Sequence, residues 1–193
     1  MPMPFDDIDA APTEALLQLY ANGDPEASRV LARRLLPRVL SHAERLLSNR
    51  AEAEDVAQEA MLRLWKIAPD WRRGEAKVTT WLYRVTGNLC TDRLRRRRGI
   101  GLDEVPEPED DTPSPADHMQ ANARAEALQA ALARLPERQR QAVVLRHIEE
   151  FGNPEIAEIM NISVEAVESL IARGKRALTG DLAAQRDELG IDE

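Results

Sequence analysis

WRRGEAKVTTWLYRVTGNLCTDRLRRRR, residues 71–98, interleaves aromatic side chains with a basic helical pattern and ends in four consecutive arginines. The stretch carries nine Lys or Arg against two acids, a local balance of 9 − 2 = +7 in a chain of formal charge −8. Such a concentration is typical of nucleic-acid binding, because Lys and Arg that neutralise phosphates release condensed counterions. The alternative is a solvated helix end, where arginine complements the helix macrodipole. Four consecutive arginines are more than the last turn of a helix needs to complement its macrodipole.

Length and composition predict an all-helical protein. The chain of 193 residues suffices for one ordinary domain or two small ones, and its 43% apolar content is enough for a buried core. Only 4% of the residues are aromatic, and tracts rich in Ala, Leu, Glu and Arg recur, which favours helices. Because the whole chain is acidic, we expect either a focused DNA site or a partner that delivers the protein to DNA.

Several classes of protein are disfavoured by the sequence. No apolar run approaches the roughly 20 residues that span a bilayer, and the N-terminus is acidic, so we expect a cytoplasmic protein without membrane insertion. Cys90 is the single cysteine, and the three histidines are scattered, which offers no metal-ligand spacing. Phosphate loops and catalytic triads are also missing from the sequence. We therefore expect no cofactor and no enzymatic activity.

The first part of the chain is expected to hold a lead-in and two helices. Residues 1–12 contain three prolines and three aspartates without periodicity, which predicts a disordered lead-in. Helices are predicted over residues 13–21 and 25–47, the second capped by Asp24 with a proline at its first position. Pro37 lies inside the second helix and predicts a kink or a break into two helices.

A third helix, predicted over residues 51–67, has an apolar stripe and an acidic, amide-bearing face. On periodicity alone this face is a solvated surface. As an enzyme site it is weak, because no nucleophile or metal ligand converges on it. The basic helix is then predicted to begin near Thr79 or Thr80. The polar face consists of Glu54, Asp55, Gln58, Glu59 and Arg63.

An acidic linker and a second helical domain follow. Residues 99–118 hold seven acids, four prolines and no Lys or Arg, which predicts an extended, self-repelling linker. Further helices are predicted over residues 120–135, 136–148, 154–160 and 164–178, with a frayed tail over residues 181–193. The last two helices and their three-residue turn have the pattern of a helix-turn-helix, whose second helix enters the major groove. Its candidate DNA-facing residues are Glu165, Glu168, Ser169, Arg173, Lys175 and Arg176.

Over nearly its whole length the chain resembles a bacterial extracytoplasmic-function (ECF) sigma factor, the smallest class of the sigma-70 family. The order and spacing of four stretches, with the acidic linker between them, carry this resemblance. It implies a region 2 helical bundle over residues 13–98 and a region 4 helix-turn-helix domain over residues 119–180. The four stretches are AEAEDVAQEAMLRLW (51–65), TTWLYRVTGNLCTDRLRRRR (79–98), LPERQRQAVVLRH (135–147) and IAEIMNISVEAVESLIARGKRAL (156–178).

The resemblance implies partners for the surfaces. Glu54, Asp55, Gln58 and Glu59 match the surface that binds the clamp helices of the polymerase β′ subunit, and the β flap of core RNA polymerase is a further implied contact. The linker matches a segment that threads through polymerase, with a simple tether as the alternative. An anti-sigma factor is also implied, because the family is commonly held by one.

The opening stretch matches the part of such factors that recognises and melts the minus-10 element of promoter DNA. Trp81 and Tyr83 match aromatic positions near the separating strands, and Asn88 matches a position that contacts a flipped base. For Trp81, packing in the apolar stripe is the heavier alternative. The minus-10 candidates are Arg72, Arg73, Lys77, Trp81, Tyr83, Arg84, Asn88, Arg95, Arg96, Arg97 and Arg98.

The second domain departs from the family pattern. Many members read GLSYEEIA and GTVKSRL where this chain reads EFGNPEIA and VEAVESLI. Glu168 stands where a basic residue is common, and Leu170 replaces a frequent arginine. Because a carboxylate is repelled by phosphate but accepts from a cytosine amino group, we expect an altered minus-35 preference.

The resemblance makes a promoter-specificity subunit of RNA polymerase the leading hypothesis for the function. Three other functions are alternatives to it. A sigma-like decoy that sequesters an anti-sigma factor is favoured by the net acidity and by Glu168, and disfavoured by the intact basic helix. A stand-alone helix-turn-helix regulator leaves the first domain unexplained. An enzyme is the most distant alternative, because the sequence lacks the motifs that catalysis needs.

Overall fold

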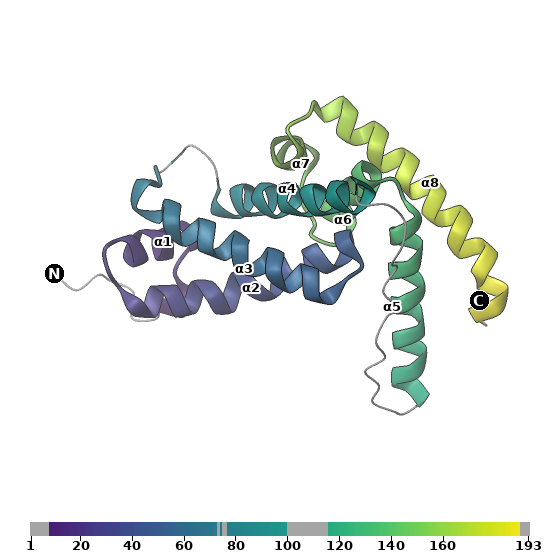
Figure 1. The fold of residues 1–193 in the computed structure, drawn as a ribbon, viewed down its shortest axis with the longest axis horizontal. Coiled ribbons are helices and arrows are strands. Elements are labelled where there is room, and N and C mark those ends of the chain that lie inside the picture. Colours follow the sequence, from purple (N-terminus) through teal and green to yellow (C-terminus); the bar gives the residue numbers. More distant parts are fainter. Residues whose placement is uncertain (1–7, 73, 75–76, 100–115, 190–193) are drawn as a thin grey trace.

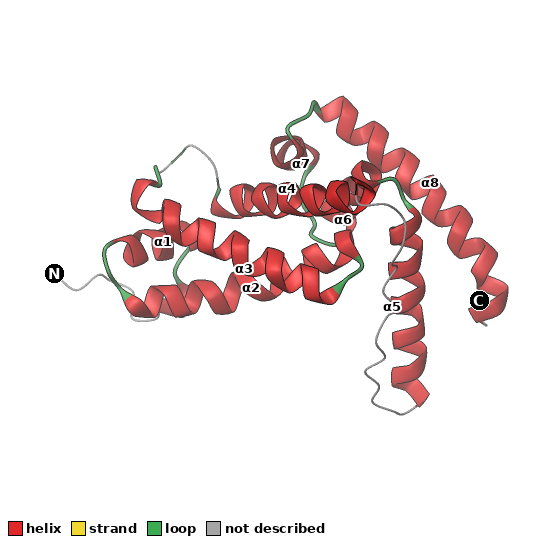
Figure 2. Cartoon of the chain, in the orientation of Figure 1, coloured by secondary structure: helices red, strands yellow, loops and turns green. Residues whose placement is uncertain are grey.

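The computed structural model describes residues 8–72, 74, 77–99 and 116–189. Within these residues all regular structure is helical, which confirms the expected all-α fold (Figure 2). The helices form two groups, one before and one after residues 100–115, and those residues contain most of the expected acidic linker. Figure 1 shows α2, α3 and α4 running side by side in the first group, while α5 and α8 extend away from it.

The first group contains α1 (Thr13–Ala21), α2 (Pro25–Leu47), α3 (Arg50–Ile67) and α4 (Val78–Gly99), with the 3₁₀ helix η2 (Ala68–Asp70) between the last two. Leucine, valine and alanine side chains of all four α-helices pack into a common core. The stripe expected on α3 is buried as predicted, apart from the partly exposed Trp65. A short 3₁₀ helix, η1 (Ile8–Ala10), precedes α1.

The described part of the lead-in is ordered, in contrast to the expectation for residues 1–12. Ile8 packs against the first core, and Ala11 is buried within it. Arg34 of α2 donates to the carbonyl oxygens of Asp9 and Ala11, at 2.8 and 2.9 Å. Hydrogen bonds from α2 therefore hold the backbone of the last part of the lead-in in place. The local composition of residues 1–12 gave no sign of this contact with α2. Residues 1–7 lie outside the described part of the chain.

Helix α2 begins as predicted and continues through Pro37. The Asp24 carboxylate accepts from the backbone N–H groups of Glu26 and Ala27 at 2.9 and 3.3 Å, which caps the first turn. Pro37 does not divide the helix, which is continuous over Pro25–Leu47. Leu35 and Val39 on either side of the proline are buried. Because each such side chain contributes about 1.5–3 kcal/mol on burial, packing offsets the lost hydrogen bond.

Helix α4 begins at Val78, slightly earlier than predicted. The cap is not a residue of the preceding loop: Val78 N–H donates to the Glu14 carboxylate of α1, at 3.2 Å. This contact crosses 64 residues of sequence, so no local pattern indicated it. Helix α1 thus fixes the start of the basic helix.

The second group contains α5 (Ala116–Arg134), α6 (Glu137–His147), α7 (Asn153–Met160) and α8 (Val164–Leu189). Helices α7 and α8 form the expected helix-turn-helix, with Asn161 in the left-handed conformation at φ 52°. Apolar residues of α7, α8 and the turn between them pack together around Ile156 and Val167. Two boundaries differ from the expectation: α5 begins inside the predicted linker, and α8 extends to Leu189 through most of the predicted tail.

The two groups are packed against each other. Helix α4 lies along α7, and the C-terminal end of α2 contacts α5 and α6 (Figure 1). Arg140 of α6 is 9% exposed and donates to the carbonyl oxygens of Ala133 and Leu135, at 2.7 and 3.2 Å, and also to that of Leu46 in α2. These bonds from the two terminal nitrogens of Arg140 join the groups at the end of α2, while its Nε atom has no hydrogen-bond partner among the described residues.

Candidate functional site

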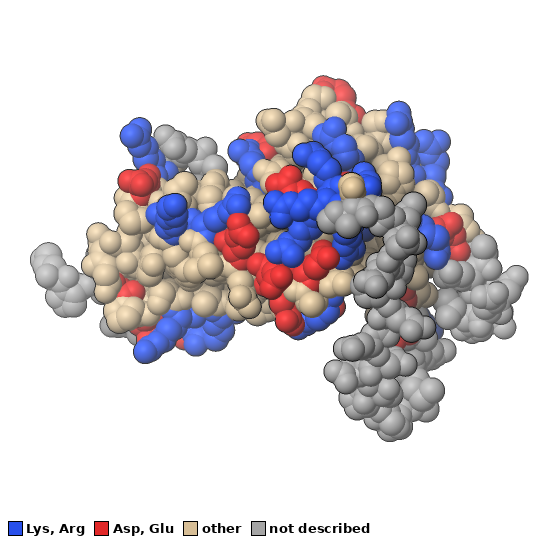
Figure 3. Space-filling model, viewed as in Figure 1, with Lys and Arg blue, Asp and Glu red and all other residues tan. Residues whose placement is uncertain are grey.

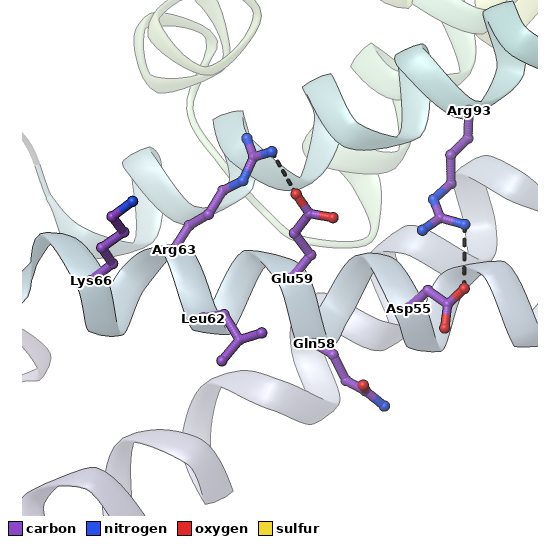
Figure 4. A pocket seen from close by; sticks show the side chains of 7 residues that line it. All are labelled: Asp55, Gln58, Glu59, Leu62, Arg63, Lys66 and Arg93. Carbon is purple, nitrogen blue, oxygen red and sulfur yellow. Dashed lines mark hydrogen bonds and ion pairs between the residues drawn. The ribbon is translucent and has the colours of Figure 1, made fainter.

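The acidic face of α3 forms a shallow pocket of about 510 Å³ on the surface of the first group (Figure 4). Leu62 lines this pocket and is 66% exposed. Both carboxylates and basic side chains line the pocket (Figure 4). The pocket is lined by Asp55, Gln58, Glu59, Leu62, Arg63, Lys66 and Arg93.

The carboxylates of this face are held in exposed ion pairs. Glu59 pairs with Arg63 at 2.6 Å, and Asp55 pairs with Arg93 of α4 at 3.4 Å. Exposed pairs contribute only about 0–1 kcal/mol, so a partner can exchange them easily. Charges that exchange partners in this way can pair with charged groups of another protein.

Three of the four candidates on this face come together at the pocket. Glu54 instead lies outside the pocket and pairs with Arg50 at 2.8 Å. The sequence reasoning missed Leu62 and the α4 residue Arg93. Leu62 was detectable as an apolar residue that interrupts the polar face, whereas the approach of Arg93 depends on how α4 packs on α3.

All four arginines at the basic end of α4 are exposed, and three of them form ion pairs, including Arg95 with Asp92 at 3.8 Å. Arg97 pairs with Glu52 at 2.8 Å and donates to the Leu47 carbonyl oxygen at 3.2 Å. Arg98 pairs with Glu137 of α6 at 3.3 Å. Arg95 and Arg96 are exposed. Figure 3 shows Lys and Arg gathered over this end of α4 and bordered by Asp and Glu.

The aromatic candidates of the basic helix lie in different surroundings. Trp81 is partly buried and meets Trp71 edge to face, with ring centroids 5.9 Å apart. Tyr83 is only 1% exposed. Asn88 and Arg72 are exposed, and Arg73 lies outside the described residues.

Tyr83 is buried beneath the second group of helices. Its hydroxyl donates to Oε2 of Glu149 at 2.5 Å, and its ring packs against Phe151 and His42, each with a centroid distance of 4.9 Å. The Nδ1 atom of His42 lies 3.7 Å from Oε1 of Glu149, an electrostatic contact longer than a hydrogen bond. Glu149, whose side chain is 8% exposed, thus contacts α2 and α4 together.

The contacts around Glu149 set the direction of two pKa shifts. Burial alone would raise the pKa of Glu149, but contacts with His42, the Tyr83 hydroxyl and Arg38 hold it below its ordinary value. Burial first, and then the bond to the carboxylate, raise the pKa of Tyr83. Tyr83 is therefore the proton donor and Glu149 the ionised acceptor over the neutral pH range.

Two further basic candidates of the minus-10 set contact the second group. Lys77 pairs with Glu155 of α7 at 2.7 Å, and the Nε atom of Arg84 donates to the Glu158 carbonyl oxygen at 2.9 Å. The hydrogen bond from Lys77 lowers the pKa of Glu155, and the same bond raises the pKa of Lys77. Lys77, Tyr83 and Arg84 are all partnered by one face of the second group.

The helix-turn-helix presents its candidates to solvent. The Ser163 hydroxyl accepts from the Ala166 N–H at 3.2 Å and caps α8. Ser169 is half-buried, and the other five candidates are exposed. The exposed face changes from acidic in the first turns of α8 to basic further along: Glu165, Glu168, Arg173, Lys175 and Arg176.

The described residues were compared with the patterns of metal-binding clusters and of membrane-spanning helices. No group of three His, Cys, Asp or Glu side chains there is arranged to hold a metal ion. None of the described helices is long and apolar enough to cross a membrane. Cys90 is buried, and burial raises the pKa of its thiol to about 12.

Two family models match the chain, one on each group of helices. The model of sigma-70 region 2 matches residues 31–100, and the model of sigma-70 region 4 matches residues 125–178. The two matched segments fall on α2–α4 and on α5–α8, respectively.

Curated relatives are similar along most of the chain. ECF RNA polymerase sigma factor SigE of Mycolicibacterium smegmatis is 35% identical over 162 residues, which is 82% of this chain but less than two thirds (62%) of SigE. SigW of Bacillus subtilis is 34% identical over 149 residues, covering 72% of this chain and 79% of SigW. SigM of Mycobacterium tuberculosis is 35% identical over 164 residues, covering 84% and 81%.

Solved structures share the fold. CnrH, in complex with the cytosolic domain of CnrY, matches with a TM-score of 0.68 and 24% identity over 92% of this chain and 99% of that chain. The sigma factor RpoE of Bartonella quintana, in complex with the anti-sigma factor NepR, matches with a TM-score of 0.63 and 21% identity over 80% and 96%. Each match covers at least 80% of the chain, so both extend over parts of the two groups of helices.

Proposed function

Because this chain belongs to the ECF sigma factors of the sigma-70 family, we propose that it binds core RNA polymerase and directs it to promoters that carry minus-10 and minus-35 elements. The observation that carries the proposal is the presence of both matched regions, in family order, on two separate groups of helices. The 34% identity to SigW over 79% of that protein supports the same role. The proposed role is non-catalytic and cytoplasmic.

The domain division follows from this assignment. We place polymerase and minus-10 binding in residues 13–98 and minus-35 binding in residues 119–180, with the acidic linker between them. These ranges contain most of the segments that the two family models match. The described helices of the second group extend beyond the proposed range at both ends, from Ala116 to Leu189.

Core polymerase is assigned to the pocket on α3. Leu62 supplies an apolar contact, and the surrounding carboxylates offer partners for basic groups of the β′ clamp helices. Asp55, Gln58 and Glu59 line this pocket, and Glu54 extends the acidic surface beside it. The β flap is the proposed second contact of polymerase, through region 4.

Promoter DNA is assigned to α4 and α8. Asn88 is exposed and is the proposed base-reading residue, with Arg95 and Arg96 as exposed phosphate contacts. Trp71 and Trp81 form an aromatic pair on which an unstacked base can rest. The exposed face of α8 is the proposed minus-35 reader, with Glu168 at its centre.

An anti-sigma factor is the remaining proposed partner. The structurally similar RpoE of Bartonella quintana was solved in complex with such a protein, the anti-sigma factor NepR. A tagged copy of this chain that retained no such protein in its native host would contradict this part of the proposal.

Run-off transcription tests the main proposal. Purified core enzyme is combined with this chain on a library of genomic promoter fragments from the host. We expect discrete transcripts from a small set of promoters that core enzyme alone does not start. Absence of binding to core enzyme in a competition assay with another sigma factor would contradict the proposal.

A matched pair of charge reversals tests the α3 surface. Glu59→Arg reverses a carboxylate that is 46% exposed and paired at i,i+4, whereas Glu26→Arg reverses one that is 47% exposed and paired at i,i+3 in α2. Because the two sites are alike in exposure and pairing, both variants should fold. We expect Glu59→Arg to weaken core binding at least tenfold and Glu26→Arg to leave it within about twofold. Equal losses of affinity for core polymerase in the two variants would contradict the assignment of α3 to the polymerase interface.

A sigma-like decoy is the second candidate. It is favoured by the exposed carboxylate of Glu168 on the proposed DNA-reading face of α8. A decoy would bind an anti-sigma factor without competing for core polymerase, so the competition assay separates the two functions.

A further inference from the structure

Helix α1 lies outside the residues that the region 2 model matches, yet it contacts the elements that carry the tryptophan pair. The model matches residues 31–100, and α1 covers Thr13–Ala21. Helix α1 contacts η2, which ends beside Trp71, and it also contacts α4, which carries Trp81. Any contribution of α1 to this pair therefore comes from residues that the family model does not match.

The link between α1 and α4 is the Glu14 carboxylate. Its Oε1 atom accepts from the backbone N–H of Val78 at 3.2 Å, and Val78 is fully buried. The first N–H groups of a helix have no acceptor within the helix, and a carboxylate beside them also faces the positive end of the helix macrodipole. Glu14 thus stabilises the first turn of α4 as a cap does, although it comes from another helix.

Lys77, the residue before α4, connects the Glu14 contact to Trp81. The pKa of Lys77 is raised first by its hydrogen bond to Glu155, and less strongly by the charge of Glu14, which places the Glu14 carboxylate close to Lys77 as well. The Lys77 carbonyl oxygen accepts from the Trp81 N–H at 3.1 Å, which closes the first turn of α4. Glu14 therefore acts on the turn from which the Trp81 side chain projects.

The two tryptophan rings are held by different elements. They meet edge to face, with an interplanar angle of 86° and ring centroids 5.9 Å apart. Both rings are partly exposed and pack against the core that contains Leu16 and Leu17 of α1. The Trp71 N–H donates to the Ala68 carbonyl oxygen at 3.2 Å, which anchors its backbone to η2. The arrangement of the pair therefore depends on η2 for Trp71 and on the first turn of α4 for Trp81.

We infer that Glu14 is a positioning residue for promoter melting: it fixes the first turn of α4 and thereby holds Trp81 against Trp71, in the arrangement that receives an unstacked base of the minus-10 strand. The inference rests on the proposed function for the role of the tryptophan pair. The place of Trp81 itself rests on contacts within the first group of helices. Because stacking depends on how the rings lie, a frayed first turn weakens base capture without removing any group that contacts DNA.

Three substitutions separate the cap from its charge. Glu14→Ala removes the acceptor of the Val78 N–H, whereas Glu14→Gln removes the charge and keeps an acceptor oxygen. Asp24→Ala is the matched control, because it removes a carboxylate that caps α2 by accepting from the Glu26 N–H at 2.9 Å. Glu14→Ala and Asp24→Ala change the net charge of the chain equally, so a difference between them reports the place of the cap.

Amide hydrogen exchange on the full-length protein measures the first turn of α4 directly. The readout is the Trp81 N–H, which is bonded to the Lys77 carbonyl oxygen only while this turn is ordered. Loss of a cap shifts the equilibrium between an ordered and a frayed turn by about two- to thirtyfold, so exchange at Trp81 should be faster by that factor in Glu14→Ala. Glu14→Gln should lie closer to the parent, and Asp24→Ala should match the parent. Unchanged exchange in Glu14→Ala would overturn the role of Glu14 at α4.

A double-mutant cycle on promoter opening tests whether Glu14 acts through Trp81. Core polymerase with the full-length chain is mixed with a promoter that the parent transcribes, labelled with 2-aminopurine in its minus-10 element, and the fluorescence rises as the strands separate. We expect Glu14→Ala to slow opening about two- to thirtyfold in the parent chain, and by less than about twofold when Trp81→Ala is already present. Glu14→Gln should retain most of the parent rate, and Asp24→Ala should stay within about twofold of it.

Affinity for core polymerase is the folding control for this cycle, because none of these substitutions changes the pocket on α3. Equal slowing by Glu14→Ala with and without Trp81 would overturn the inference, since Glu14 would then act by another route. Equal slowing by Asp24→Ala would also overturn it, because the loss would reflect the stability of the first group alone. A parent chain that opens no promoter would overturn the proposed function as well, whereas additive losses in a parent that opens promoters would overturn the inference alone.

Discussion

Gly174 in α8 should be intolerant of even one added methyl group. A Cβ atom at this position would lie 2.6 Å from Cγ2 of Val143 in α6, and 3.4 Å from the Gln139 carbonyl oxygen. Favourable contacts between carbon atoms lie at about 3.5–4.0 Å, so the two helices must separate by roughly 1 Å. Val143 cannot easily turn aside, because a β-branched side chain in a helix has one strongly preferred rotamer.

The magnitude follows from two opposing terms. Replacing a helical glycine by alanine stabilises the helix by about 1 kcal/mol, whereas overpacking a core costs about 1–3 kcal/mol. Gly180 in the same helix provides the control, because nothing lies within 4 Å of its added Cβ atom. Gly180→Ala should therefore stabilise region 4 by up to about 1 kcal/mol, and Gly174→Ala should be less stable than Gly180→Ala by about 1–3 kcal/mol.

Urea denaturation followed by circular dichroism measures this difference directly. Both variants change the same residue type in the same helix, so their effects on the unfolded chain cancel. If Gly174→Ala were as stable as Gly180→Ala, the close packing of α6 on α8 that supports the helix-turn-helix would be refuted.

Four further predictions concern the interface and the DNA-reading faces. Contacts hold the pKa of Glu149 below its ordinary value of 4.5, so its contribution to stability is present above pH 4.5 and is lost as the pH falls through the lowered pKa. Urea denaturation should show a lower free energy of unfolding at that acidic pH, and a smaller decrease in Glu149→Gln. Asn88→Ala should change the ranking of minus-10 variants in transcription assays. Neutralising Arg95 and Arg96 together to Gln should instead weaken promoter binding about equally across sequences and reduce its salt dependence. Glu168→Arg should change the ranking of minus-35 variants, and an unchanged ranking would exclude this carboxylate from base reading.

The sequence predicted helices most accurately where their signals were local. Asp24 and the proline after it marked the start of α2, and the three-residue turn before Val164 marked the helix-turn-helix. Each of these signals acts within a few residues of the helix end. The all-α fold and the division into two groups of helices followed from such patterns.

The differences arise where distant residues supply the partner. Glu14 caps α4 from another helix, so the start of α4 was predicted slightly too late. Pro37 remains inside α2 because buried neighbours on both sides of it pack into the core. Burial of Tyr83 under Glu149 joins residues 66 apart in sequence, and no periodic pattern indicates such a contact. The same limit applies to Arg93, which reaches the α3 pocket only through the packing of α4.

Hydrogen bonds and ion pairs form part of the contact between the two regions, and this has a consequence for how strongly they must bind. Two separate molecules joined by a few hydrogen bonds and ion pairs would dissociate at ordinary protein concentrations. Within one chain each region experiences the other at an effective concentration on the order of millimolar. The bonds from Tyr83, Lys77 and Arg140 can therefore be individually weak and still keep the regions together. The same weakness makes the contact between the regions reversible, because a competitor that binds either surface more tightly than the millimolar range separates them.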